Sequence, residues 1–177
     1  MEKDQISKIT EARRKYCPEK IKYLLIGKAS PINEDAYFYF ENVPQGDSMF
    51  LEVMKVIQPR QITLYLNSKR DSFKKAYLLK EFKREGFYMM DLCNGPSDTS
   101  KSRFKEELDE LEKNGNIDEA TKIIPLFSRV YDFLLEQLGD TGMLIKVRIF
   151  GPGSGQQKFF NAQFRQALEL AGYHFHD

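Results

Sequence analysis

The feature that most constrains the fold of this chain is a dense apolar run over residues 21–27 that ends on a glycine. A run of this length and density is typical of a buried strand. After Gly27 the sequence changes at once to a polar loop, residues 28–36, which contains Pro31. Ligands of open α/β sheets bind at the carboxyl ends of strands, so this loop is the first candidate for a functional site.

Apolar runs and helix-like segments alternate along the whole chain. The expected strands cover residues 21–27, 87–92, 122–127 and 143–150. The expected helices cover residues 2–16, 49–57, 72–86, 102–113, 128–138 and 156–170. Residues 61–68 fit a strand or a helix, and residues 37–40 fit a short extended piece or part of a loop. This alternation predicts one α/β domain over residues 1–177, a three-layer α/β/α sandwich around a mainly parallel, four-stranded sheet.

The composition is that of a soluble globular protein. Of the 177 residues, 41% are hydrophobic and 30% are charged, and the formal net charge is +1. No apolar run approaches the roughly 20 residues that cross a bilayer, and the charged start Met1–Asp4 does not resemble a signal peptide. We therefore expect a cytoplasmic protein without a membrane partner. A nearly neutral chain neither requires nor excludes a polyanionic partner such as DNA.

Two cysteines and two histidines provide little material for a metal site or for nucleophilic catalysis. Cys17 precedes the first expected strand, and His174 and His176 stand at the end of the chain. A structural zinc site needs about four ligands, and the spacing of Cys17, Cys93, His174 and His176 matches no zinc module. The sequence therefore predicts free thiols, no metal and no cofactor.

The loop after the first strand combines polar and aromatic side chains. Lys28 places a cation beside the strand end, and Asn33 offers a polar group for positioning a water molecule or a ligand edge. The aromatic residues that close the segment are Tyr37, Phe38 and Tyr39. They either stack on a flat ring, as aromatic residues do on nucleic-acid bases, or alternate across a short strand with one side in the core.

A second candidate loop, Gly151–Lys158, precedes the last expected helix. Its glycines and proline hold the backbone open where the N–H groups and the positive dipole end of that helix point. The side-chain donors in the loop are Ser154, Gln156, Gln157 and Lys158. This arrangement predicts binding of a phosphate or another anion, whereas a tight structural turn would explain the glycines alone. The Gly-Lys-Ser/Thr ending of a P-loop is absent, and the glycine spacing differs from that of a dinucleotide fingerprint.

A third candidate loop begins with Asp91 at the end of the second expected strand and contains Asn94. A carboxylate at the end of a buried strand is costly unless it is paired or hydrogen-bonded. Asp91 is therefore expected to activate a water molecule, to bind a ligand, or to tie down a neighbouring loop. The basic stretch over residues 60–75 either contacts phosphates or forms a solvated helix face.

Taken together, the three loops resemble the uracil-DNA glycosylase superfamily, in which a strand ends in a Gly-x-x-Pro type motif. The corresponding segment here is Leu25–Pro31. It keeps Gly27 and Ala29 of the Gly-Glu-Ala-Pro-Gly motif found in the thermostable branches. Lys28 stands where that motif has glutamate, and Ser30 stands where it has proline.

Two further elements carry the resemblance. A family strand ends in a group that reads the edge of the base, and its counterpart here is Asp91 or Asn94. A His-Pro-Ser-Pro type loop precedes the last family helix, and its counterpart is Gly151–Gly155, with Gly151 at the position of the histidine.

The resemblance implies a cleft at the strand ends that binds a nucleobase or nucleotide, or DNA, and it implies hydrolysis of an N-glycosidic bond. The catalytic residues would then be Asp91 and Asn33. The ligand-binding residues would be Gly27, Lys28, Ser30, Tyr37, Phe38, Tyr39, Asn94, Gly153, Ser154, Gln156 and Lys158. The alternative is a non-catalytic α/β domain that binds a small anion or a protein partner through the same cleft.

Overall fold

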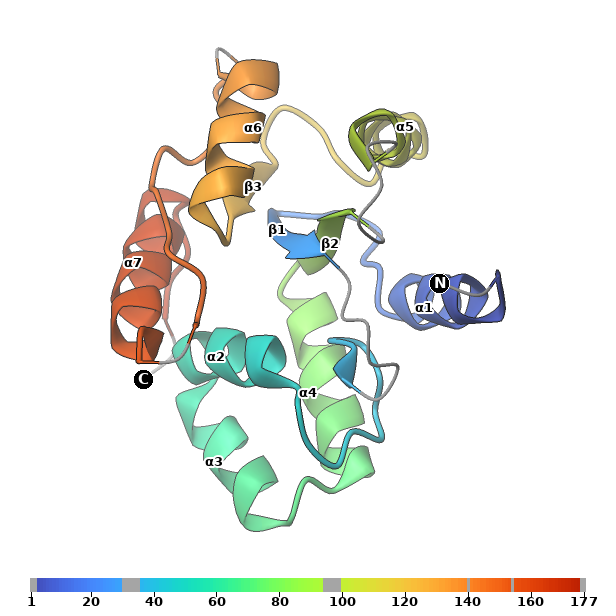
Figure 1. Ribbon diagram of the computed structural model, residues 1–177, viewed down its shortest axis with the longest axis vertical. Helices are drawn as coiled ribbons and strands as arrows, with labels where there is room; N and C mark the ends of the chain where they lie inside the picture. Colours follow the sequence, from blue (N-terminus) through green and yellow to red (C-terminus); the bar gives the residue numbers. More distant parts are fainter. Residues whose placement is uncertain (1–2, 30–35, 94–99, 140, 154, 176–177) are drawn as a thin grey trace.

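The computed structural model describes residues 3–29, 36–93, 100–139, 141–153 and 155–175, in which helices and strands alternate (Figure 1). The strands are β1 (Tyr23–Ala29), β2 (Phe87–Cys93) and β3 (Lys122–Pro125). The helices are α1 (Lys3–Lys15), α2 (Ser48–Ile57), α3 (Pro59–Asn67), α4 (Ser72–Arg84), α5 (Ser100–Lys113), α6 (Ser128–Leu138) and α7 (Gln157–Leu170). The α/β class expected from the sequence is confirmed.

The strands of the described residues form a parallel sheet in the order β2-β1-β3, with β1 at its centre. The pairing of β1 with β2 places Gly27 beside Asp91. Leu24, Leu25 and Ile26 of β1 are all completely buried. Because successive residues of a strand point to opposite faces, both faces of the sheet are covered.

The covering elements are helices on different sides of the sheet. α4 and α5 pack against β2, whereas α6 packs against β1 and β3. α2 packs against α7, and in Figure 1 α6 and α7 lie to the left of the sheet and α1 to its right. Among the described residues, none of the helices has the length and apolar character needed to span a bilayer.

The expected four-stranded sheet is wrong by one strand. Residues 143–150 are described throughout, yet they form no strand, and only Leu144 makes a bridge, to Ile123 of β3. The segment is nevertheless apolar because it contributes to the core. Its buried side chains are Leu144, Ile145, Val147 and Ile149.

A missing donor on β3 explains why the segment does not continue as a strand. Ile123 donates its N–H to the Met143 carbonyl at 2.9 Å and accepts from the Ile145 N–H at 2.9 Å. The next donor on this edge of β3 would be residue 125, but Pro125 has no N–H. The Ile145 carbonyl instead accepts from the Val147 N–H at 2.9 Å, so the ladder ends after one bridge.

The two segments with an ambiguous pattern are a helix and a turn. Residues 61–68 fall mostly within α3, which starts at Pro59 and buries Ile62 and Tyr65 one turn apart. Proline suits this first helical position because the N–H it lacks would have no partner inside the helix. Residues 37–40 form a turn that is closed by a hydrogen bond from the Phe40 N–H to the Tyr37 carbonyl at 3.1 Å.

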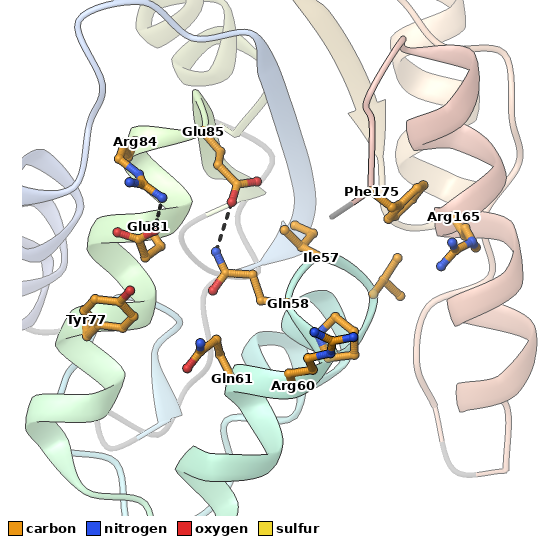
Figure 2. A pocket seen from close by; sticks show the side chains of 12 residues that line it. Ile57, Gln58, Arg60, Gln61, Tyr77, Glu81, Arg84, Glu85, Arg165 and Phe175 are labelled. Carbon is orange, nitrogen blue, oxygen red and sulfur yellow. Dashed lines mark hydrogen bonds and ion pairs between the residues drawn. The ribbon is translucent and has the colours of Figure 1, made fainter. Parts of the chain in front are cut away.

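The junction of α2 and α3 is joined to the amino ends of the strands. Gln58 ends α2, where its N–H donates to the Met54 carbonyl at 2.8 Å, and its Nε2 donates to Glu85 Oε1 at 3.1 Å (Figure 2). Glu85 also accepts from the Tyr173 hydroxyl at 2.6 Å. The Tyr173 ring packs at 5.2 Å from that of Phe87, the first residue of β2. The end of α4 and the segment after α7 therefore meet at this junction.

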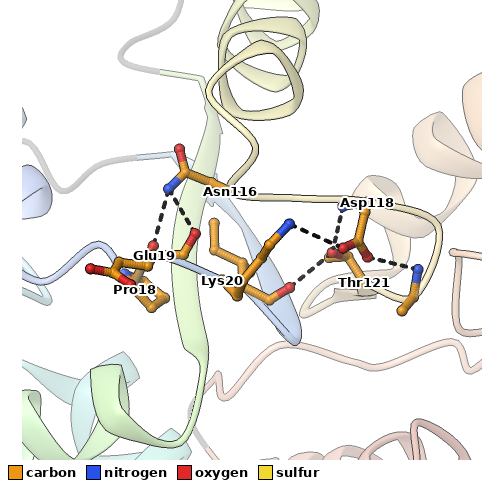
Figure 3. A network of polar contacts seen from close by, with 8 residues as sticks. Pro18, Glu19, Lys20, Asn116, Asp118 and Thr121 are labelled. Atoms are coloured by element: carbon orange, nitrogen blue, oxygen red, sulfur yellow. Dashed lines mark hydrogen bonds and ion pairs between the residues drawn. The ribbon is translucent and has the colours of Figure 1, made fainter.

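A second network joins the segments that precede β1 and β3 (Figure 3). The Asn116 Nδ2 donates to the Pro18 carbonyl at 3.1 Å. Thr121 Oγ1 donates to the Ile21 carbonyl at 2.8 Å and accepts from the Asp118 N–H at 3.1 Å. Because Thr121 is buried, water cannot replace these two hydrogen bonds.

We expect Thr121→Val to lower the free energy of unfolding by about 1–3 kcal/mol, because valine leaves a buried carbonyl and a partly buried N–H without their partner. Urea denaturation measures this loss. Thr63→Val is the matched control, since the exposed Thr63 hydroxyl donates only to the Pro59 carbonyl of its own helix. The control should stay within about 0.5 kcal/mol of the wild type. Equal losses in the two variants would show that the network does not stabilise the strand starts.

Candidate functional site

A cleft of about 300 Å³ lies at the carboxyl ends of the strands. Its walls come from the end of β1 and the loop after it, the end of β2, the connection from β3 to α6, the start of α2 and the loop before α7. Gly27, Asp91 and Gly153 all line it. The three sequence segments singled out as candidate loops thus contribute described residues to one cleft.

Gly27 and Asp91 both line the cleft and are neighbours on adjacent strands. A Cβ atom at Gly27 would lie only 2.4 Å from Asp91 Oδ1, so the carboxylate occupies space that any larger residue would take. Burial, together with the negative charge of Asp91, raises the pKa of Tyr37, which also lines the cleft. Tyr37 therefore keeps its proton and remains a hydrogen-bond donor close to an acceptor.

Phe127 forms part of the wall of the cleft, and Gly151, next to the lining residue Pro152, lies against its ring. Phe127 is half-buried and immediately precedes α6. A Cβ atom at Gly151 would lie 2.1 Å from Cε1 and 2.2 Å from Cδ1 of the Phe127 ring. The absence of a side chain at Gly151 is thus what allows this ring to take its place in the wall.

The aromatic residues expected to stack on a ligand are mostly committed to the core. Tyr37, Phe38 and Tyr39 are 2%, 4% and 1% exposed. The Tyr39 hydroxyl accepts from the Met89 N–H at 2.7 Å and donates to the Met89 carbonyl at 3.3 Å, so it replaces a neighbouring strand at this edge of β2. Phe38 packs edge-on against Phe50. Only Tyr37 and Phe38 of the three line the cleft.

The remaining expected site residues are distributed around the cleft or outside the described part. Lys28 lines the cleft and is exposed at its rim. Gln156 and Lys158 are exposed near the start of α7, and neither belongs to the cleft lining. Ser30, Asn33, Asn94 and Ser154 lie outside the described residues.

Several lining residues were not expected from the sequence, namely Met49, Met89, Phe127, Gly46 and Ser48. A sequence signal existed for Phe127, because it is the last residue of the third expected strand and the rule about strand ends applies to every parallel strand. Met49 and Ser48 belong to the first turn of α2, whose approach to the sheet depends on tertiary packing.

A buried ionic cluster holds the segment that carries Gly46 and Ser48. Asp47 Oδ1 accepts from the Arg70 guanidinium at 2.5 Å, and Oδ2 accepts from Lys75 Nζ at 3.3 Å and from the Tyr65 hydroxyl at 3.4 Å. The Asp47 and Lys75 side chains are both completely buried. Lys75 also lies 4.4 Å from the centre of the Phe50 ring. The cluster thus fixes α3 and α4 to the edge of the cleft.

The described residues contain no group of histidine, cysteine and carboxylate side chains that could hold a metal ion. Cys17 is a free thiol, as expected, and burial raises its pKa. It lies outside the lining of the cleft. A comparison of the chain with protein-family models, with curated proteins and with solved structures finds no match.

Proposed function

We propose that the cleft binds a nucleobase or a nucleotide, either free or as part of DNA. The observation that carries this proposal is a carboxylate in the lining of an otherwise largely apolar cleft of about 300 Å³. Pockets for small molecules span about 300–1,000 Å³, so this volume suits a single planar ring system. Asp91 would accept the N–H groups on the edge of the base, and Met49 and Phe127 would cover its faces.

The remaining contacts divide between the ring and the backbone of the ligand. Phe127 is the half-buried aromatic residue of the wall, and stacking of a base on an aromatic ring contributes about 1–3 kcal/mol. Lys28 at the rim is placed to contact a phosphate. Taking a base out of a duplex costs a few kcal/mol, so single-stranded or mismatched DNA is the favoured form of a polymeric ligand.

Hydrolysis of the N-glycosidic bond is a narrower proposal on the same cleft. Asp91 would accept a proton from a water molecule as the water oxygen attacks the sugar carbon and the base departs. The resembled family uses a histidine to support the departing base, and Gly151 stands at that position here. Binding is therefore the function that the geometry supports best, and hydrolysis is measured separately.

The decisive variant is Asp91→Asn, which keeps the size of the side chain and removes its charge. We expect it to weaken binding of a single-stranded oligonucleotide containing one uracil by about tenfold or more, because the base edge loses a charged acceptor. Lys28→Ala should weaken binding across all sequences and reduce the salt dependence of the affinity by about one phosphate contact. Fluorescence anisotropy over a salt series measures both effects.

Lys113→Ala is the matched control, since Lys113 is exposed at the end of α5 and does not line the cleft. Release of free uracil from the same oligonucleotide tests hydrolysis. Affinity for mononucleotides without affinity for DNA would favour the small-anion alternative. Absence of binding at low salt, or identical affinities for the wild type and Asp91→Asn, would refute nucleobase binding in this cleft.

A further inference from the structure

A second pocket, of about 430 Å³, lies where α2, α3, α4 and the segment after α7 meet (Figure 2). It lies near the amino ends of the strands, because Glu85 in its wall directly precedes Gly86 and the start of β2. Its lining residues and those of the cleft do not overlap. Any ligand of this pocket would therefore bind at a separate site.

Arginine side chains outnumber carboxylates in the lining of this pocket. Glu81 pairs with Arg84, and Glu85 accepts hydrogen bonds from Gln58 and Tyr173. Both carboxylates are thus already engaged by the protein. Arg60, from α3, is exposed, and the described residues offer it no carboxylate within ion-pairing distance. Arg165, from α7, forms an exposed ion pair with Glu169 at 3.5 Å, and exposed pairs of this kind hold their partners weakly.

The two arginines come from different helices, and Arg165 lies beside the ring of Phe175 (Figure 2). The Arg165 guanidinium lies 4.0 Å from the centre of the Phe175 ring, which holds it in a fixed orientation. Tyr77 of α4 leaves 51% of its surface exposed, which is high for an aromatic residue in a pocket wall.

An unsatisfied acceptor adds an independent observation. Gln58 directs Nε2 to Glu85, and its Oε1 is buried without a hydrogen-bond partner among the described residues. Buried polar atoms of proteins nearly always have a partner, so this part of the pocket wall has an acceptor that a donor from water or from a ligand would satisfy.

We propose that this pocket binds a nucleoside monophosphate. The phosphate, with two negative charges, lies between Arg60 and Arg165, whose planar guanidinium groups match phosphate oxygens in geometry. The base stacks on the exposed ring of Tyr77, next to the Gln58 amide. A molecule with only one of these parts would contact either the arginines or the aromatic ring, but not both. The proposal is independent of the function proposed for the cleft.

Isothermal titration of the full chain at low salt tests the proposal with adenosine, guanosine and cytidine monophosphates, with inorganic phosphate as a separate arm. At least one nucleotide should bind, and Arg60→Ala and Tyr77→Ala should each weaken its binding by about tenfold or more. Both side chains are exposed and form no hydrogen bond or ion pair with the part of the chain that the structure describes, so the variants should unfold as the wild type does. Arg129→Ala, at an exposed site on α6 outside the pocket, is the matched control and should leave the affinity unchanged.

Three results would overturn the proposal. Equal affinities for inorganic phosphate and for every nucleotide, with no effect of Tyr77→Ala, would show a phosphate site without base recognition. Loss of nucleotide binding in Asp91→Asn but not in Arg60→Ala would assign the ligand to the cleft and support the function proposed there. Absence of binding by any nucleotide would refute the second site and leave DNA binding by the cleft untouched.

Discussion

Asp47→Asn is expected to lower the free energy of unfolding by about 3–5 kcal/mol, because it removes the charge that compensates a completely buried lysine. The Asp47 carboxylate accepts from Arg70 at 2.5 Å and from Lys75 at 3.3 Å. Asparagine keeps the shape of the side chain but leaves the Lys75 ammonium buried without an anion. The loss also weakens the hold on the α3–α4 connection, where Lys69 and Arg70 both adopt positive φ. Urea denaturation at neutral pH measures the effect.

Two comparisons separate this explanation from a general effect of the substitution. Asp132→Asn removes a carboxylate that is half exposed and pairs with Arg148, and exposed pairs contribute about 1 kcal/mol or less. The double variant Asp47→Asn/Lys75→Met removes both buried charges and should be more stable than Asp47→Asn alone. If adding Lys75→Met lowers the stability further, the uncompensated lysine is not the cause of the loss.

The same cluster predicts how stability depends on pH. Burial lowers the pKa of Lys75 to about 8, although Asp47 acts in the opposite direction, whereas an unfolded chain has the ordinary value of 10.5. Between these two values the unfolded chain binds more protons, so this residue makes the free energy of unfolding rise with pH. The rise amounts to at most about 3 kcal/mol. A Lys75→Met variant should lack it, and parallel pH profiles for the two proteins would contradict the assignment.

The hydrophobic pattern of each segment was sufficient to predict most of the helices and strands, because these depend mainly on residues within the segment itself. The apolar run over residues 21–27 overlaps β1, which starts at Tyr23 and buries side chains on both faces of the sheet. Residues 143–150 carry a similar pattern, and their aliphatic side chains are also buried. Whether such a segment becomes a strand depends on the backbone N–H groups of the strand beside it. Here that strand is β3, and Pro125 has no N–H for the second hydrogen bond of the ladder. Pro125 is distant in the sequence from residues 143–150, so the hydrophobic pattern of that segment does not indicate its effect.

The location of the cleft followed from the rule for strand ends, whereas the roles of individual side chains did not. Gly27 and Asp91 meet because parallel strands place their carboxyl ends at one edge. Tyr39 is an aromatic residue of the type that stacks on bases, but it is buried in the core, where its hydroxyl accepts a hydrogen bond from the Met89 N–H. Lys75 belongs to a basic stretch that suggests a solvated face, and only the fold brings Asp47 to it. Burial of this kind depends on contacts between distant segments.

Gly151→Ala is expected to impair both stability and ligand binding. The added methyl group would lie 2.1 Å from the Phe127 ring, whereas carbon atoms in contact are about 3.5–4.0 Å apart. The ring must therefore move by more than 1 Å, and overpacking of this kind costs about 1–3 kcal/mol. Because the ring forms a wall of the cleft, its movement should also weaken binding of the uracil oligonucleotide by about tenfold. Urea denaturation and fluorescence anisotropy measure the two effects.

Gly153→Ala is the matched control for this prediction. Gly153 belongs to the same loop and lines the same cleft, but a Cβ atom there would meet nothing within 4 Å. The control should stay within about 0.5 kcal/mol of the wild type. A smaller residue at position 127 should relieve the clash, so the loss of stability caused by Gly151→Ala should be smaller in a Phe127→Leu background than in the wild type. If the two losses simply add, the contact between the loop and the ring is not what requires glycine at position 151.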